Sequence, residues 1–446
     1  MSFFLISYLF LFALITWRRF DLGLFFLFFL LPVYLIRFSL GPIPTTLLEA
    51  MFYIIFIIWL LKKYNISYLL SLISKIKTYP SFFIAITLFL IAATISIFTS
   101  IDARAALGEW KAFYIEPILL FLVLITALKT KKQIDTILFA LILSGFLTSL
   151  LAIYQKYTGW YVPWEYWENR HTFRVTGWYG FPNGVGLFLA PLVPLAIYLV
   201  KNCYHKLKEL KRSKKQEARN KQITNDKIKT WLIFVSCILY LVSSLPAIFF
   251  ARSTGGLVGA AAGIIFLLLV HKKTRWPTVI IGLASFVGLV GLNRFSNIRQ
   301  ELFLQDRSGQ IRIEMWSEAI EFLRARPVAG AGLASYKTLI YPYRIDKWIE
   351  VFHHPHNLFL TMWVNLGLLG LIGFVWILVW FYRVGLKNLQ PTSYKLQAFL
   401  LASMTTLLTT GLVDSPYIKN DLALFFWLLP ALMVVASGQN EKNIVD

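Results

Sequence analysis

The sequence predicts an all-α, polytopic integral membrane helical bundle with about 12 or 13 transmembrane helices. Hydrophobic residues make up 58% of the chain and charged residues only 15%, with a positive mean hydropathy. Several apolar runs approach or exceed the roughly 18 residues that suggest a spanning helix. The alternating ten-residue strands of an outer-membrane barrel are absent from the sequence. Because lipid offers the backbone no hydrogen-bond partners, we expect these runs to be helices.

The apolar runs follow one another along the whole chain. The expected spans are 3–17, 22–36, 47–61, 81–99, 117–128, 137–154, 183–200, 231–250, 257–270, 279–292, 358–382, 398–413 and 422–436. The first two are each shorter than a comfortable span, which leaves the count at 12 or 13. Segment 66–77 is expected to lie at the membrane interface. No small-residue cleavage site follows the first run, so we expect it to be retained.

The net charge of +22 is distributed unevenly between the polar loops. Loop 201–229 holds nine lysines and two arginines against three acids, a net charge of +8, whereas segment 294–356 carries only +2. Cytoplasmic loops carry the excess of Lys and Arg, which predicts that the first loop and the C-terminus are cytoplasmic and that 294–356 lies on the opposite side. The charge therefore indicates topology and contact with membrane lipids rather than with nucleic acid.

This pattern predicts three parts in a multi-pass protein of the cytoplasmic (inner) membrane. Segment 1–293 holds the N-terminal transmembrane helices with the basic loop 201–229. Segment 294–356 is a large, partly helical extracytoplasmic loop, and 357–446 holds the C-terminal transmembrane helices.

Three of the six histidines lie in the stretch His353-His354-Pro355-His356-Asn357, directly before an apolar run. Asn357 is expected to be the N-cap of that helix, because its side-chain oxygen can accept an unpaired N–H of the first turn. His356 would then lie beside a helix N-terminus, whose free N–H groups and dipole favour an anion. The same field favours a neutral imidazole that can accept a proton. The alternative is that these histidines are ordinary interfacial polar residues.

Further polar residues are expected on the same outer face. Asn183 is expected to cap a second helix there, with Arg174 a few residues before it. Arg252 lies between two spans, where it either anchors the helix end by snorkelling or binds a ligand. The glycines that follow Arg252 would allow close backbone approach.

The segments expected on the outer side also contain an arginine on a helix face and several tryptophans that are candidate binding residues. Segment 309–326 is expected to be an amphipathic helix that ends at Pro327 and places Arg312, Trp316, Ala319, Ile320 and Leu323 along one face. An arginine on an apolar face needs a partner, either a phosphate or a local carboxylate such as Glu314 or Glu318. Trp164, Trp167 and Trp178 are glycan-stacking candidates, or members of an interfacial aromatic belt.

Several chemistries find no support in the sequence. It contains no Asp-x-Asp, no Walker loop and no Gly-x-Ser-x-Gly elbow. The three clustered histidines lack the Cys or carboxylate spacing of a zinc site, so we expect no metal and no cofactor. Cys203 and Cys237 predict no disulfide framework.

Five motifs together resemble the O-antigen ligase and O-antigen polymerase family of membrane glycosyltransferases. They are Gly-Trp-Tyr-Gly-Phe-Pro-Asn at 177–183, Arg-Ser-Thr-Gly-Gly at 252–256, Arg312 ahead of Met315-Trp316, Pro-Val-Ala-Gly-Ala-Gly at 327–332, and His-Pro-His-Asn at 354–357. They occur in the family's order and cover roughly residues 80 to 435. Each motif alone is weak, but their order and shared outer face make the resemblance fairly specific.

The resemblance implies transfer of a glycan from an undecaprenyl-pyrophosphate donor to a hydroxyl acceptor on a glycan, lipid or protein at the periplasmic or extracellular face, without metal or nucleotide sugar. It assigns the role of general base to His356 and pyrophosphate binding to Arg252 and Arg312, with Arg174 as a further candidate. Asn357, Asn183 and His354 would support them. A repeat-unit polymerase of the same family and, from another class, a multi-span transporter are the alternatives. The charge-poor spans do not favour the transporter.

Overall fold

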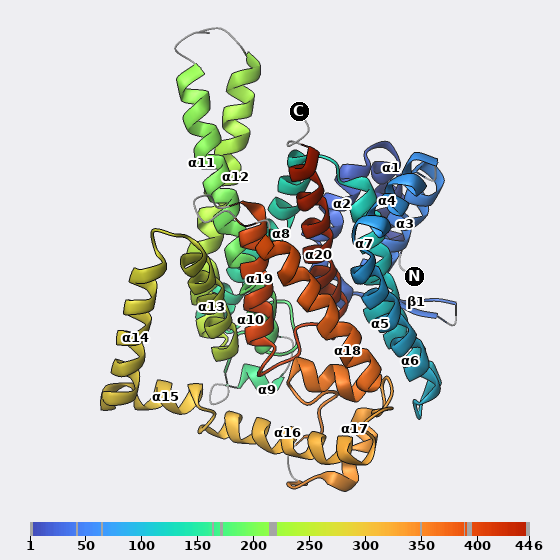
Figure 1. Ribbon diagram of the computed structural model, residues 1–446, viewed down its shortest axis with the longest axis vertical. Helices are drawn as coiled ribbons and strands as arrows, with labels where there is room; N and C mark the ends of the chain where they lie inside the picture. The colour runs from blue at the N-terminus through green and yellow to red at the C-terminus, as the bar shows by residue number, and fades with distance from the viewer. Residues whose placement is uncertain are drawn as a thin grey trace. The chain divides into compact units, whose positions relative to one another are not determined.

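The computed structural model of the chain describes residues 3–41, 43–63, 66–162, 165–169, 173–213, 221–347, 350–387, 389 and 395–442. These residues are mainly helical (Figure 1). They form two compact units that each combine separate stretches of the chain: unit 1 holds Met1–Lys63 and Leu128–Gly263, and unit 2 holds Tyr64–Ala127 and Ile264–Asp446.

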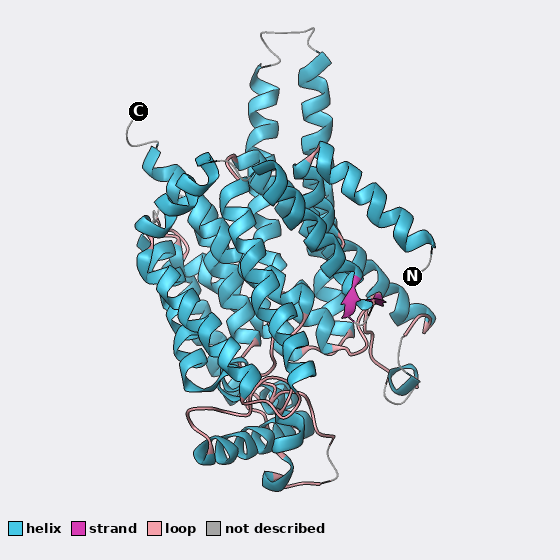
Figure 2. Ribbon diagram, turned by 90° about the vertical axis from the view of Figure 1, so that its right-hand side faces the viewer, coloured by secondary structure: helices cyan, strands magenta, loops and turns pink. Residues whose placement is uncertain are grey.

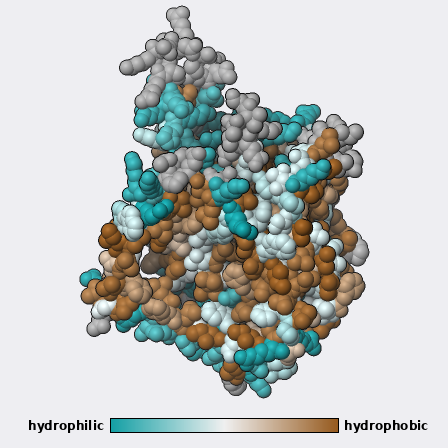
Figure 3. All heavy atoms as spheres, in the orientation of Figure 1, coloured by the Kyte–Doolittle hydropathy of each residue, from teal (hydrophilic) through white to brown (hydrophobic). Residues whose placement is uncertain are grey.

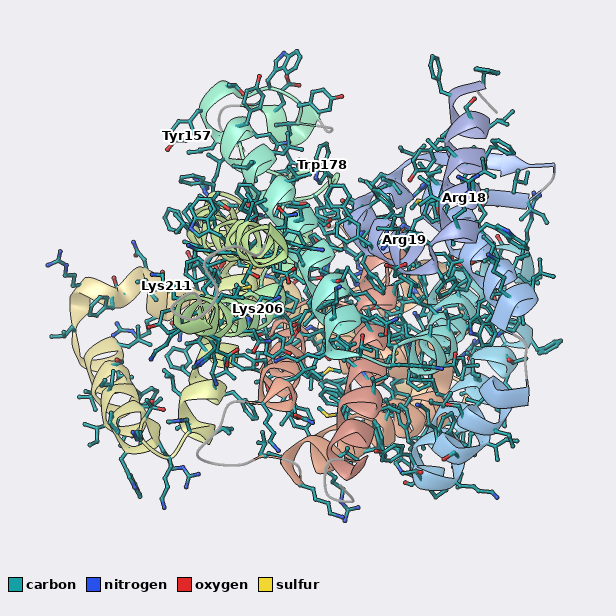
Figure 4. All side chains as sticks on the ribbon, turned by 90° about the horizontal axis from the view of Figure 1, so that it is seen from above. Arg18, Arg19, Tyr157, Trp178, Lys206 and Lys211 are labelled. Carbon is teal, nitrogen blue, oxygen red and sulfur yellow. The ribbon has the colours of Figure 1, made fainter. Side chains whose placement is uncertain are left out.

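Unit 1 is built from helices and one short hairpin. Its elements are α1 (Phe3–Arg18), α2 (Phe20–Phe29), η1 (Leu31–Leu35), β1 (Arg37–Leu40), β2 (Ile43–Thr46), α3 (Leu47–Lys63), α8 (Lys131–Thr158), α9 (Glu165–Glu168), α10 (Asn183–Leu189), α11 (Leu192–Ser213), α12 (Lys221–Phe250) and the first part of α13 (Thr254–Val270). The two strands pair antiparallel, with Arg37 opposite Thr46 and Leu40 opposite Ile43. Arg18 and Arg19 lie at the junction of α1 and α2 (Figure 4).

Unit 2 contains the second group of apolar helices and the polar segment between them. Its elements are α4 (Ile66–Thr78), α5 (Pro80–Phe98), α6 (Ala103–Glu109), the π-helix η2 (Trp110–Ile115), α7 (Glu116–Ala127), the end of α13, α14 (Arg275–Gly291), η3 (Asn293–Phe295), α15 (Ser296–Leu302), α16 (Arg307–Ala325), α17 (Tyr336–Leu339), η4 (Tyr341–Tyr343), α18 (Leu358–Lys387), α19 (Leu396–Thr410) and α20 (Asn420–Lys442). Among the described residues, four helical elements (α15, α16, α17 and η4) lie wholly within the polar segment 294–356, which is partly helical as predicted.

The length and hydropathy of the helices confirm a polytopic all-α membrane protein. Seven helices among the described residues are long and apolar enough to cross a membrane, or eight if the bent pair Arg275–Gly291 and Ser296–Ala325 is one span. Four shorter apolar helices include α1 and α2, which cover the first two expected spans. A ten-residue helix such as α2 is only about 15 Å long, against a hydrocarbon core of about 30 Å. The count of 12 or 13 spans thus stays a prediction.

The basic loop predicted at 201–229 joins two long helices. Figures 1 and 2 show α11 and α12 side by side as an antiparallel pair, and both helices extend into the basic loop, beyond the expected apolar runs that end at Val200 and begin at Trp231. Hydrophilic residues cover this outer part (Figure 3). Lys206 and Lys211 lie on it and are exposed (Figure 4). The basic residues therefore lie on the ends of α11 and α12 that extend beyond their apolar stretches.

Helix α16 confirms the predicted amphipathic helix but buries a face rotated from the expected one. Its buried residues are Gly309, Met315, Glu318, Ala319, Phe322 and Leu323, whereas Ile320 is 43% exposed. The prediction that Ile320 lies on the buried face of the helix is therefore wrong. Residues 315, 318, 319, 322 and 323 follow the 3–4 spacing of a helix stripe, and Phe322 anchors this stripe by packing against Tyr336 and Tyr343.

The motif at 327–332 fastens the polar segment to a kink in α18. Gly367 interrupts α18 with φ 67°, and the backbone groups released there pair with the motif: Leu368 N–H donates to Val328 O (3.1 Å) and Ala331 N–H donates to Val364 O (2.7 Å). A Cβ atom at Gly330 or Gly367 would collide with carbonyl oxygens of the facing segment. These glycines are therefore required by close backbone approach.

Candidate functional site

The centre of the candidate site is a histidine paired with a buried aspartate. His356 Nδ1 lies 3.0 Å from Asp414 Oδ1, and the two side chains are 18% and 6% exposed. A carboxylate at this distance favours the tautomer in which Nδ1 carries the proton and donates to it. Nε2 is then the proton-accepting atom of the ring. Phe352 and His354 pack edge-on against the ring, with centroids 4.8 and 4.9 Å away.

The local backbone holds His356 in a strained conformation. Its φ of 46° lies in the left-handed region, which is uncommon for a residue with a side chain. Asn357 directly follows, and its Oδ1 accepts the N–H groups of Phe359 (3.0 Å) and Leu360 (3.1 Å). The predicted N-cap is thus confirmed. Asn357 Nδ2 also donates to Leu412 O (3.0 Å), which ties the histidine turn to the segment that carries Asp414.

The expectation of free N–H groups at this helix end is wrong. Leu358 N–H donates to Gly411 O (2.7 Å), the next two N–H groups bond to Asn357 Oδ1, and Thr361 N–H bonds to Asn357 O (2.8 Å). All four donors of the first turn are therefore paired within the protein. The cap that positions His356 also removes the anion site that the sequence predicted there.

Asp414 lies in the turn between α19 and α20 and is held from two sides. Its Oδ1 accepts the N–H of Ser415 (2.8 Å) as well as the bond from His356. Burial alone would raise the pKa of Asp414, but the charge and hydrogen bond of His356 and the charge of Arg312 hold it well below its usual value. The carboxylate is therefore ionised and able to stabilise a protonated imidazole.

Arg312 reaches the same turn from α16. Its Nε donates to Val413 O (2.8 Å), and its Nη1 donates to Ser308 Oγ (2.6 Å) and O (3.2 Å). None of these bonds uses Nη2. Of the two carboxylates that the sequence offers as alternative partners, Glu318 pairs instead with Arg344 at 3.4 Å. Arg312 thus places a half-buried positive charge beside the residue that precedes Asp414.

His354, which packs against His356 in unit 2, is a neutral imidazole. Burial and the nearby charge of His356 lower the pKa of His354 to about 3. Its Nδ1 is shielded from solvent and makes no hydrogen bond to the described residues. His354 therefore packs against His356 without carrying a charge at neutral pH.

The second group of predicted residues lies in unit 1. Arg174 Nε donates to Ala251 O (2.9 Å), and its Nη2 donates to Arg252 O (2.9 Å) and to Asn183 Oδ1 (3.1 Å). Arg252 is exposed and has φ 48°. The guanidinium of Arg174 therefore holds the turn on which Arg252 stands. Asn183 is not an N-cap: it is the first residue of α10, after Pro182, and its side-chain oxygen serves Arg174 instead.

The glycines after Arg252 allow close backbone approach, but to a neighbouring helix of the protein. A Cβ atom on Gly256 would lie 2.8 Å from Gly186 Cα, so the start of α13 approaches α10 closely.

The tryptophan candidates divide into three cases. Trp178 is 40% exposed and Trp167 is partly buried, with the Arg174 guanidinium 5.3 Å from its ring centroid. This cation–π contact gives Trp167 a partner within the protein. Trp164 lies outside the described residues.

Comparison with known proteins finds a family match over part of the chain. Residues 239–375 match the family model described as O-antigen ligase. The similarity to the O-antigen ligase family therefore covers about a third of the chain. The segment matched to the O-antigen ligase model contains Arg252, Arg312 and His356 and ends before Asp414.

The chain is also similar to proteins named as candidate polysaccharide ligases. One from Rickettsia conorii is 27% identical over 188 residues, which cover 39% of this chain and 43% of the relative. One from Rickettsia felis is 24% identical over 185 residues, covering 40% and 45%. One from Rickettsia prowazekii is 25% identical over 180 residues, covering 39% and 44%. The chain thus spans less than half the length of the relatives that it matches.

The described residues contain no group of three or more His, Cys, Asp or Glu side chains arranged to hold a metal ion. The expectation of a metal-free site stays a prediction.

Sequence reasoning missed Asp414 altogether. It was hidden because it follows the apolar run 398–413, 58 residues away from His356 in the chain. Its isolation was the available signal, since an acid at the end of an apolar run needs a partner. Val413, a partner of Arg312, lies 101 residues away from it and was missed for the same reason, whereas Ser308 lies one helical turn before Arg312 on α16.

Proposed function

We propose that the chain transfers a glycan from an undecaprenyl-pyrophosphate donor to an acceptor hydroxyl on a lipid, a protein or a polysaccharide. The observation that carries this proposal is the His356–Asp414 pair at 3.0 Å, with Arg312 bound to the neighbouring Val413. A proton acceptor and a fixed positive charge beside one turn suit the attack of a hydroxyl on a sugar–pyrophosphate bond. The family match and the ligase-named relatives support the reaction class.

In this proposal His356 is the general base. With Nδ1 donating to Asp414, Nε2 takes the proton of the acceptor hydroxyl as that oxygen attacks the anomeric carbon. General base catalysis of this kind contributes typically about 10²–10⁴-fold. The ionised Asp414 stabilises the imidazolium that forms and keeps the ring oriented. His354, which is neutral, adds no competing charge.

Arg312 would bind the pyrophosphate of the donor. Its Nε and Nη1 are fixed by the protein, and its Nη2 makes no hydrogen bond to the described residues, so the guanidinium can bind a phosphate oxygen without reorganising. Arg252 is a second pyrophosphate-binding candidate because it is exposed on a turn that Arg174 holds. Arg174 itself would act on the donor by positioning Arg252.

The reaction balances without a cofactor. The bond between the anomeric carbon and the pyrophosphate oxygen breaks, a glycosidic bond to the acceptor oxygen forms, and undecaprenyl pyrophosphate leaves with its electron pair on oxygen. The hydroxyl proton passes to His356 and then to solvent. The donor bond supplies the driving force. By charge distribution, the site would face the periplasm or the exterior of a cytoplasmic membrane.

An in vitro transfer assay tests this function. Purified protein is given a glycan on undecaprenyl pyrophosphate, the same glycan on undecaprenyl monophosphate, and membranes of the source organism as acceptor, with and without EDTA. We expect transfer from the pyrophosphate donor alone, unchanged by EDTA. Loss of transfer with chelator would contradict the metal-free mechanism, and no transfer from either donor would contradict the function. A ladder of repeat units as product would indicate polymerase instead of ligase activity.

A further inference from the structure

Tyr417 lies three residues after Asp414 in the same turn between α19 and α20. The side chain is fully buried among aromatic rings, with the centroids of Phe426, Tyr114 and Phe374 at 5.1, 6.0 and 6.2 Å. Ring packing therefore fixes the position of the phenol, and the hydroxyl oxygen has a single place to lie.

The Tyr417 hydroxyl joins two other elements. It donates to Phe113 O (2.8 Å) and accepts the indole N–H of Trp427 (3.0 Å). Phe113 lies inside the π-helix η2, where the wider turn changes the backbone pairing of an α-helix and is often found at functional sites. Burial raises the pKa of Tyr417 well above its usual value, so the hydroxyl remains a donor. The turn is thereby tied to η2 and α20 at once.

From Tyr417 a short chain of contacts leads to the histidine. Tyr417 N–H donates to Ser415 O (2.8 Å), Ser415 N–H donates to Asp414 Oδ1 (2.8 Å), and that oxygen bonds to His356 Nδ1. Ser415 Oγ is also 2.7 Å from Thr361 Oγ1 on α18. The carboxylate is thus held between two anchors, one at α18 and one at Tyr417.

We infer that Tyr417 is a positioning residue of the transfer reaction, which sets the place of Asp414, and through it of His356, by its hydroxyl bond to the π-helix carbonyl of Phe113. Tyr417 touches no substrate in this scheme. The inference rests on the proposed function for its catalytic consequence, but its structural part concerns the reactivity of His356 and is measurable without transfer.

The matched pair of variants is Tyr417→Phe and Tyr240→Phe. Both remove one hydroxyl from a tyrosine with no exposed surface, and both break a bond to a backbone carbonyl, since Tyr240 donates to Leu189 O (2.6 Å) in unit 1. Tyr417→Phe also leaves the buried indole N–H of Trp427 unpaired, so it should lose somewhat more stability than Tyr240→Phe. Only Tyr417→Phe should alter the histidine.

The first readout is the rate at which diethyl pyrocarbonate modifies His356 in the full chain, followed by tandem mass spectrometry without donor or acceptor. We expect Tyr417→Phe to lower this rate at least about threefold and kcat of transfer about tenfold, with the KM of the donor unchanged, as for an outer partner of a reactive histidine. Tyr240→Phe should match the wild type in both measurements.

A double-mutant cycle with Asp414→Asn tests the route. If Tyr417 acts through Asp414, Tyr417→Phe should cause no further loss of labelling or kcat in the Asp414→Asn background. Wild-type labelling in Tyr417→Phe, an equal change in Tyr240→Phe, or additive losses in the double variant would each overturn the inference. Absent transfer in the wild type with the labelling differences intact would instead contradict the proposed function alone.

Discussion

The two clusters of predicted site residues use arginine in different ways. In unit 2, Arg312 is fixed by bonds from Nε and Nη1 and lies beside an ionised carboxylate and a histidine. In unit 1, Arg174 donates hydrogen bonds from Nε and Nη2 to carbonyl and amide oxygens of the same unit, while Arg252 remains exposed. The same residue type thus serves as a candidate ligand in two places and as a brace in the third. Motif position alone does not separate these roles.

The largest expected loss that sharpens this comparison comes from Arg312. Arg312→Ala removes a charge placed for the leaving pyrophosphate, so kcat/KM for the donor should fall by about 10²–10³-fold in the transfer assay. Arg312→Lys keeps the charge but not the planar guanidinium, and it should recover only part of the loss. Full activity of Arg312→Ala would remove Arg312 from the site.

Asp414→Asn should cause the next largest loss. The amide has nearly the same shape but no charge to orient and stabilise the imidazolium, so kcat should fall about 10–100-fold. The KM of the donor should remain close to that of the wild type, because Asp414 touches no substrate. A variant with unchanged kcat would show that the 3.0 Å pair is only structural.

Arg252→Gly separates ligand binding from backbone strain. Arg252 has φ 48°, a conformation that glycine adopts without the cost of about 1 kcal/mol that a side chain carries. The variant should therefore be as stable as the wild type or slightly more so, while its donor KM rises about tenfold, the value of one charge-assisted hydrogen bond. Unchanged donor KM would assign Arg252 to anchoring alone.

Arg174→Gln should show the opposite balance. The variant loses the bonds that hold the 251–252 turn, so the free energy of unfolding should fall by about 1–3 kcal/mol. The donor KM should rise as well, because Arg252 is no longer held in place. In the double variant with Arg252→Gly, Arg174→Gln should have no further effect on the donor KM. An additional increase there would indicate that Arg174 binds the donor directly.

The smallest predicted effect concerns pH. The folded-state pKa of His354 lies near 3, below its unfolded value of about 6.5, so its contribution to stability is complete above pH 6.5 and is lost as the pH falls toward 3. Between pH 7 and pH 5 this should lower the free energy of unfolding by at most about 2 kcal/mol. Thermal unfolding across that range should show a weaker pH dependence in His354→Phe, whereas the exposed His205→Phe should match the wild type.

The parts of the site that the sequence predicted are those fixed by local rules. The Asn357 cap and the α16 amphipathic pattern depend on neighbours within four residues, and both are confirmed. Asp414 and the role of Arg174 depend on partners 58 and 77 residues away, which no local pattern reveals. The predicted anion site at the α18 end failed because Asn357 and Gly411 take its N–H groups. The sequence was enough to predict the fold class and the motifs, but not which residues the site side chains pair with.

The fold, too, has features that the sequence predicts and features that it does not. Hydropathy predicted the helical membrane class correctly, because it depends on composition and run length. It could not predict the kink at Gly367, where the motif at 327–332 replaces helical hydrogen bonds with its own.

The most direct measurement is single-turnover transfer by His356→Ala, with the lipid-pyrophosphate donor bound before acceptor is added. The variant should remain folded and membrane-inserted and should still bind donor, but the rate of glycan transfer should fall about 10²–10⁴-fold, the usual contribution of a general base. A rate equal to that of the wild type would contradict the assignment of His356 and move the chemistry away from the His356–Asp414 pair.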